Sequence, residues 1–188
     1  MIDELNEVGE ADVRLEVILE RAQISPSSLY HHFGNLRGLI EDAHVERFVR
    51  EIYGRLDELK VQLEDMETRD DFIKIVDGTL DIFFTDQRKL ARFRRLNALG
   101  SSYGRPEFAK RLAGAERDAN KRTAEVLKVA QYRGFIAKSV DLEVFAAWLN
   151  ASLVGGTAID LMDDDDFRKK WTEMVRATTK YLLGLDTK

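Results

Sequence analysis

Neutral hydrogen-bonding side chains are concentrated in one short segment, ISPSSLYHHFGN at residues 24–35. Two serines, a tyrosine and two of the chain's three histidines lie within residues 27–32. Hydroxyl, phenol and imidazole groups can donate hydrogen bonds to phosphate oxygens and base edges without carrying a fixed charge. No acidic residue occurs between Arg21 and Ile40. The segment is therefore a candidate contact surface for a polyanion, although a solvated helix surface can have the same composition.

A short helix over residues 26–33 is predicted to position these side chains. Ser25 can cap its start, Pro26 suits the first helical position because its missing N–H is not needed there, and Gly34 can end it. Helical spacing places Leu29 and Phe33 on one face, directed toward a core. The hydroxyl, phenol and imidazole groups then lie on or near the other face, close to a helix N-terminus that favours anions.

Helices are also predicted on both sides of this segment. Asp12 is a candidate N-cap for a helix that runs to about Ala22, and a tight turn follows at Gln23. Asn35 is expected to cap a helix that runs to about Met66. Two helices joined by a turn of a few residues, the second short and polar on its outer face, are typical of a helix-turn-helix.

The sequence ILERAQISPSSLYHHFGNLRGLI, residues 18–40, resembles the DNA-binding signature of the tetracycline-repressor (TetR) family. In that family a helix ending in Ile-Ala-x-x-Ala-Gly-Val-Ser leads to a recognition helix of the form x-x-x-Leu-Tyr-x-His-Phe. The residues that match without a gap are Ile18, Ala22, Ile24, Ser25, Leu29, Tyr30, His32, Phe33, Asn35 and Leu39. Gly9 stands where the family's first helix usually ends.

The resemblance implies an all-α protein with a helix-turn-helix DNA-binding domain at residues 1–50. A helical effector-binding and dimerisation domain at residues 51–188 would follow. It further implies a homodimeric transcriptional repressor that a small-molecule effector releases from a double-stranded DNA operator, with no membrane partner. The residues expected near base edges or phosphates are Arg14, Ser27, Ser28, Tyr30, His31, His32 and Arg37.

The chain departs from the family pattern at four places. Leu36 stands where the family often has a phosphate-binding lysine, and the neighbouring Arg37 can substitute for it. Val13 and Arg14 replace a Thr-Ser pair, and Gln23 replaces a turn glycine, which strains the turn if its φ is positive. The first helix, in MIDELNEV, is half as long as is typical of the family. This indicates a truncated or misassigned start, and predicts a DNA-binding domain that buries less apolar surface.

The overall composition limits the classes of protein that fit. The net charge of −5 speaks against nucleic-acid binding, so that function depends on a surface locally free of acids. Only two prolines occur, which favours an all-helical fold. No cysteine is present, so disulfides and thiolate metal sites are excluded and a reducing, cytoplasmic compartment is expected. We find no secretory signal and no apolar run near the roughly 20 residues that span a bilayer.

Beyond residue 68 the sequence predicts further helices separated by brief breaks. Their expected bounds are Asp71–Phe84, Asp86–Leu99, Pro106–Arg133, Leu142–Met162 and Asp164–Leu183. Residues 88–95, RKLARFRR, are basic, and helical spacing predicts inward apolar residues and a solvated arginine stripe with salt bridges to neighbouring helices. The apolar residues are Leu90, Phe93 and Leu96, and the arginines are Arg88, Arg92 and Arg95.

An effector cavity and a dimer interface are predicted within this helical part. The expected lining of a cavity for an apolar ligand is Phe72, Val76, Phe83, Phe93, Asn97, Tyr103, Val126, Leu149 and Asn150. Two glycines lie mid-helix at residues 155–156, where each costs about 1 kcal/mol relative to alanine, so a close approach is expected there. The resemblance implies that the last two long helices pair with those of a second copy, and core packing within one subunit is the alternative. The residues expected at this interface are Trp148, Ser152, Gly155, Gly156, Ile159, Phe167, Trp171, Met174, Thr178 and Tyr181.

Other functions fit the residues less well. Catalysis needs a cluster of activated groups, and the chain has no cysteine or glycine-rich phosphate loop. The acids at residues 163–166 more simply cap a helix than bind a metal. We therefore expect no enzyme activity, cofactor or metal. The alternative to a DNA-binding regulator is a small-molecule-binding helical dimer that has lost DNA binding through its short first helix.

Overall fold

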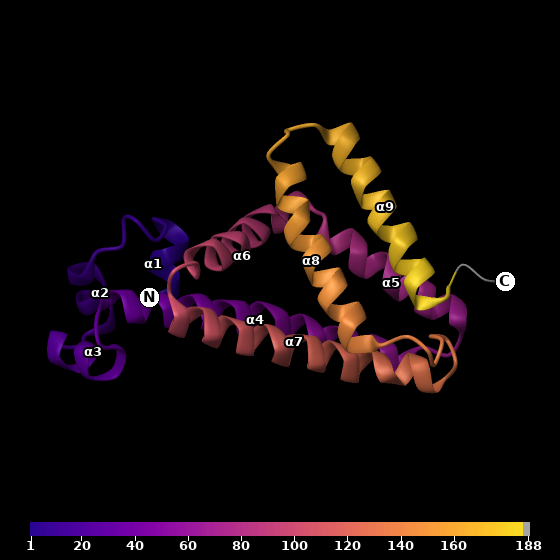
Figure 1. Cartoon of the computed structure of the whole chain (residues 1–188), viewed down its shortest axis with the longest axis horizontal. Coiled ribbons are helices and arrows are strands. Elements are labelled where there is room, and N and C mark those ends of the chain that lie inside the picture. The colour runs from indigo at the N-terminus through magenta and orange to yellow at the C-terminus, as the bar shows by residue number, and fades with distance from the viewer. Residues whose placement is uncertain (186–188) are drawn as a thin grey trace.

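The computed structural model describes residues 1–185, and every regular element in that range is a helix (Figure 1). The helices are α1 (Ile2–Glu7), α2 (Leu15–Ala22), α3 (Pro26–Phe33), α4 (Leu36–Asp65), α5 (Arg69–Phe83), α6 (Lys89–Ser101), α7 (Pro106–Tyr132), α8 (Leu142–Asp160) and α9 (Asp165–Leu183). A 3-10 turn, η1 (Asp86–Arg88), precedes α6. The all-α prediction is confirmed, and the predicted bounds agree within a few residues.

The first three helices form a small unit at one end of the molecule (Figure 1). α4 begins in this unit and continues beside α7, which runs in the same direction. Near the start of both helices the rings of His44 and Phe108 lie 6.1 Å apart, and near their ends Arg133 donates to the carbonyl oxygen of Met66. α4 is therefore one continuous helix that joins the unit of α1, α2 and α3 to the remaining helices.

The main core lies between the second half of α4 and helices α5, α7, α8 and α9. Its buried members include Leu63, Phe72, Leu80, Leu127, Phe145, Leu153, Val175 and Leu183. Two smaller clusters hold α1, α2 and α3 on α4. In one, Leu5 packs with Ile40 and Ala43, and in the other Ile18 and Leu29 pack with Leu39.

Side-chain caps fix several helix starts. Ser25 Oγ accepts the N–H of Ser28 at 3.2 Å, and Asn35 Oδ1 accepts the N–H of Gly38 at 2.9 Å, so both predicted caps are confirmed. Asp141 and Asp164 cap the starts of α8 and α9 in the same way, and Asp164 is one of the acids at residues 163–166 that the sequence predicts as a helix cap.

One predicted cap is wrong. α2 begins at Leu15 with Arg14 in the N-cap position and no side-chain cap bond, and Asp12 lies in the preceding turn. Val13 packs against both small clusters, and this extended link delays the start of the helix.

A buried ion pair joins α6 to α8. Arg92 donates to both carboxylate oxygens of Asp160, at 2.8 and 2.9 Å, and to the carbonyl oxygen of Phe83 at 2.6 Å. Arg92 is only 6% exposed, whereas Leu90 and Leu96 are exposed. The predictions of a solvated Arg92 and of inward Leu90 and Leu96 are therefore wrong, because α6 turns the Arg92 face toward α8. The predicted salt bridges between neighbouring helices are present.

Candidate nucleic-acid interface and ligand cavity

α3 is anchored by its inner face and ended by a positive-φ residue. Leu29 is fully buried, and Phe33 packs against the same cluster. Gly34 follows the helix with φ of +73°, a conformation that glycine adopts without steric cost. These local features leave the remaining side chains of α3 directed outward.

The outer face of α3 carries the hydrogen-bonding residues that the sequence singles out. Tyr30 is 47% exposed, and His31 and His32 are exposed with their rings 5.1 Å apart. Ser27 is exposed and Ser28 is half-buried. The structure thus brings all five side chains to one surface of a single short helix.

Two further arginines outside α3 are also exposed. Arg14 precedes α2 and Arg37 lies in the first turn of α4, and both are exposed. Arg21 is engaged instead by α1, since it forms ion pairs with Glu4 at 3.0 Å and with Glu7 at 2.9 Å. Arg14 and Arg37, by contrast, form no ion pair within residues 1–185.

The turn before α3 is strained. Gln23 has φ of +53° and ψ of +40°, the left-handed conformation, which costs a residue with a side chain about 1 kcal/mol. Its N–H bonds to the carbonyl oxygens of Glu20 and Leu19, which ends α2. The strain predicted for Gln23 is confirmed.

Glu10, in the link between α1 and α2, ties the first helices to the rest of the molecule. Its carboxylate accepts hydrogen bonds from Ser101 at 3.0 Å, Arg105 at 3.1 Å and His44 Nε2 at 3.1 Å. The buried His44 ring also accepts from Arg47 at its Nδ1 atom, at 3.1 Å, so a neutral ring satisfies both contacts. Burial and the Arg47 charge lower the pKa of His44 below its ordinary value of 6.5.

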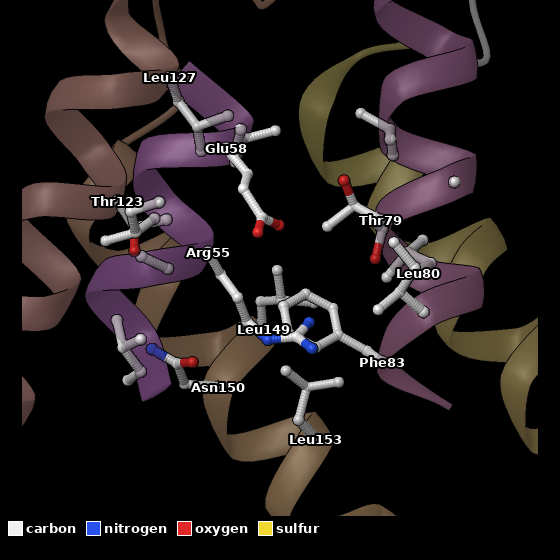
Figure 2. A pocket seen from close by; sticks show the side chains of 18 of the residues that line it. Arg55, Glu58, Thr79, Leu80, Phe83, Thr123, Leu127, Leu149, Asn150 and Leu153 are labelled. Carbon is white, nitrogen blue, oxygen red and sulfur yellow. The ribbon is translucent and has the colours of Figure 1, made fainter. Parts of the chain in front are cut away.

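A cavity of about 470 Å³ lies between α4, α5, α6, α7, α8 and α9 (Figure 2). This volume is in the range of small-molecule sites. Five of the predicted lining residues contribute to it, namely Phe72, Val76, Phe83, Leu149 and Asn150.

The other predicted lining residues lie elsewhere. Phe93 and Asn97 line a separate depression on the other side of α6. Tyr103 is 94% exposed in the loop after α6, and Val126 packs against the core without lining the cavity. Helical periodicity places a residue on a face of its own helix but does not say which neighbour that face meets.

Polar residues that the sequence did not single out also line the cavity. Arg55 and Glu58 project from α4 and Thr79 from α5, and Figure 2 shows all three at the cavity. The Arg55 guanidinium lies 5.2 Å from the centroid of the Phe83 ring. Arg95 forms an ion pair with Glu116 at 2.6 Å. The lining is therefore more polar than the expected set, whose polar members are Asn97, Tyr103 and Asn150, and it also contains charged residues.

The predicted interface residues of α8 are turned partly into the subunit. Ile159 is 7% exposed, and a Cβ at the buried Gly156 would lie 3.3 Å from Phe84 Cε1. The close approach at Gly156 is thus made within the subunit. The prediction that Gly156 and Ile159 lie at the dimer interface is wrong, because both residues are buried in the subunit core. The exposed face of α8 is displaced by one residue, and its members are Val144, Ala147, Ala151, Gly155 and Ala158. Trp148 and Ser152 are half-buried beside it.

On α9 the predicted outward residues are exposed. Phe167, Met174 and Tyr181 recur every seven residues and are 46%, 65% and 73% exposed. Trp171 and Thr178 are half-buried beside them. This spacing makes one apolar stripe along the helix.

Comparison with solved structures places this arrangement among known folds. Neither a protein-family model nor a curated protein matches the sequence. A regulator assigned to the TetR family from Mesorhizobium loti superposes with a TM-score of 0.68 and 12% identity, covering 98% of this chain and 91% of that one. A regulator assigned to the same family from Rhodococcus sp. superposes with a TM-score of 0.65 and 20% identity, covering 97% of this chain and 93% of that one. The chain has the TetR fold. GusR of Salmonella enterica, at TM-score 0.61 and 20% identity over 97% and 91%, is also similar.

α8 contradicts the expectation that no apolar run approaches the length needed to span a bilayer. It is the one helix in residues 1–185 that is long and apolar enough to cross a membrane by length and composition. Phe145 and Leu153 of α8 are buried in the main core, and core helices pass the same test.

Proposed function

We propose that the chain is a dimeric, ligand-responsive DNA-binding regulator, a repressor that a small molecule releases from its operator. The observation that carries this proposal is the outer face of α3, where five neutral hydrogen-bonding side chains are presented with no acid from Arg21 to Ile40. The TetR fold supports the same conclusion, since its solved examples are transcriptional regulators.

Local placement explains how an acidic chain can bind DNA. Ser27 and Tyr30 are suited to base edges, because their hydroxyls can donate and accept hydrogen bonds. The side chains suited to phosphates, as hydrogen-bond donors, are those of Ser28, Tyr30, His31, His32, Arg14 and Arg37. Few fixed positive charges take part. We therefore expect modest affinity that depends mainly on hydrogen bonding and falls with salt.

A dimer is needed to place two α3 helices in successive major grooves. The exposed small residues of α8 would allow a partner helix to approach closely, and the apolar stripe of α9 would pack beside them. Four helices, two from each copy, would then bury these faces together.

Two helices, α4 and α6, extend from the cavity to the first three helices, which supports control of DNA binding by a ligand in the cavity. α6 lines the cavity with Arg92 and Arg95, and at its other end Ser101 bonds to Glu10 beside the α3 unit. α4 carries Arg55 at the cavity and His44 at the same junction. A ligand that favours one spacing of α4 and α6 would bias the separation of the two α3 helices in the dimer.

The test is selection of binding sites from random double-stranded DNA by the full chain. We expect a palindromic sequence whose half-sites lie about one helical turn apart, roughly 34–36 Å. Tyr30→Ala should then weaken binding to the selected site about tenfold, the size of one lost base contact. Tyr132→Ala, at an exposed tyrosine near the far end of α7, is the matched control and should have no effect.

Two results would contradict the proposal. Equal binding by the wild type and Tyr30→Ala would remove α3 from the interface. Failure to enrich any sequence, with the dimer intact, would favour a helical dimer that binds small molecules only.

A further inference from the structure

The cations that line the cavity are not equally neutralised. Arg92 is paired with Asp160 and Arg95 with Glu116, and Lys74 lies 3.5 Å from Asp71. The side chains of Arg55 and Arg88 form neither a hydrogen bond nor an ion pair with any residue in the range 1–185. Two guanidinium groups at the cavity are thus left for another partner.

Arg55 is partly removed from water, which disfavours its charge unless an anion lies nearby. It is half-buried, and Figure 2 shows its guanidinium beside Phe83 and Leu149. Burial and the nearby Arg88 charge both lower the pKa of Arg55. An anion between the two guanidinium groups would relieve their repulsion and accept charge-assisted hydrogen bonds from both.

The remaining cavity wall is mostly apolar. It is formed by Leu59, Val76, Leu80, Leu127, Phe145 and Leu153, contributed by four different helices. A wall of this kind binds hydrocarbon by removing it from water.

Two acidic residues, Glu51 and Glu58, also line the cavity, and they would favour a cationic ligand instead of an anion. Figure 2 shows the Glu58 carboxylate directed into the cavity, and Glu51 lies one turn before Arg55 on α4. Neither forms an ion pair with Arg55; Glu58 is exposed and Glu51 is half-buried like Arg55. Both acids raise the pKa of Arg55, but burial and the Arg88 charge outweigh them, so the two acids offset the Arg55 charge only in part. A cation would bind beside Glu51 and Glu58, whereas an anion would bind at Arg55 and Arg88.

We infer that the cavity takes an amphipathic anion, with its anionic group at Arg55 and Arg88 and its apolar body against the inner wall. This inference rests on the proposed function for treating the cavity as the effector site. It narrows the ligand from any apolar molecule to an organic acid with a hydrocarbon part.

The experiment compares three probes that share one chain and differ in the head group: decanoate, decylammonium and decanol. Calorimetric titration of the full chain without DNA should give the tightest binding with decanoate. Arg55→Met keeps the apolar stem and removes the charge, and should weaken decanoate binding about tenfold or more while leaving decanol unchanged. Arg88→Met should act in the same direction, and provides the test if Arg55→Met does not fold.

Arg122→Met is the matched control. Arg122 lies 3.8 Å from the centroid of the Tyr53 ring, so it is also stacked on an aromatic side chain, but it does not line the cavity. Its substitution should leave the affinity for decanoate at the wild-type value.

The inference is overturned if decanoate does not bind, or if decanol or decylammonium binds as tightly. It is also overturned if both cavity variants keep wild-type affinity for decanoate, or if Arg122→Met weakens it equally. Because DNA is absent, these outcomes are independent of whether the chain selects a DNA sequence.

Discussion

Two threonine hydroxyls in the core, those of Thr157 and Thr179, have no hydrogen-bond partner among residues 1–185. Thr179 lines the cavity, where a ligand can satisfy its hydroxyl. Thr157 is fully buried away from the cavity lining, and its unpaired hydroxyl destabilises the folded state.

Thr157→Val should therefore stabilise the protein. Valine has nearly the same shape and no hydroxyl, so the free energy of unfolding should rise by about 1 kcal/mol. Urea unfolding measures this change. Thr172→Val is the control: the Thr172 hydroxyl donates to the carbonyl oxygen of Arg168 at 3.0 Å, so its removal should bring no gain. A loss of stability in Thr157→Val would show that the hydroxyl is bonded.

At the scale of elements, Glu10 joins the link between α1 and α2 to the rest of the molecule. This junction depends on the protonation of Glu10 and His44. Burial raises the pKa of Glu10, but the hydrogen bonds from Ser101, Arg105 and His44 outweigh this effect and leave its pKa below the ordinary 4.5. The pKa of His44 is lowered as well. A charged His44 would also lose the hydrogen bond that its Nδ1 accepts from Arg47.

Acid should weaken this junction, and His44 sets the first window. Between its lowered pKa and 6.5 the unfolded chain binds more protons than the folded chain, so the free energy of unfolding falls as the pH falls. The lowered pKa of Glu10 acts in the same direction below 4.5. Both shifts predict a protein that is more stable near neutral pH than in mild acid.

The measurement is urea unfolding at pH about 7.5 and about 5.5. His44→Gln removes the titrating ring and should reduce the loss of stability between the two conditions. His32→Gln, at an exposed histidine of α3, should keep the wild-type difference. An unchanged pH dependence in His44→Gln would contradict the role of His44.

For the whole molecule, the proposed dimer depends on the exposed faces of α8 and α9. Met174 lies at the centre of the α9 stripe, and in a dimer an aspartate there would be buried without a partner. Met174→Asp should destabilise the dimer by about 3 kcal/mol or more, measured by sedimentation at several concentrations.

Val61→Asp is the matched control for that experiment. Val61 is 58% exposed and Met174 65%, but Val61 lies on α4, away from both faces. It should leave association unchanged. Equal dissociation constants for Met174→Asp and wild type would place the dimer interface elsewhere, and weaker association in both would point to a general loss of stability.

The bounds of α3 and the outward direction of its polar side chains follow from local features of the sequence. Ser25, Pro26, Leu29 and Gly34 act through caps, fixed backbone angles and helical spacing, all of which operate within a few residues. For the same reason the all-helical fold, the ends of most helices and the strained turn at Gln23 could be predicted.

Which neighbour each helix face meets depends on long-range contacts that local sequence patterns do not specify. Arg92 and Leu90 both lie on α6, and periodicity predicts that the leucine is buried and the arginine exposed. The structure has the reverse, because Arg92 pairs with Asp160, which is distant in sequence. In the same way α8 buries Gly156 against Phe84, and α4 directs Arg55 into the cavity. Helical periodicity fixes which residues share a face, whereas the choice of the buried face is made by contacts between segments far apart in the chain.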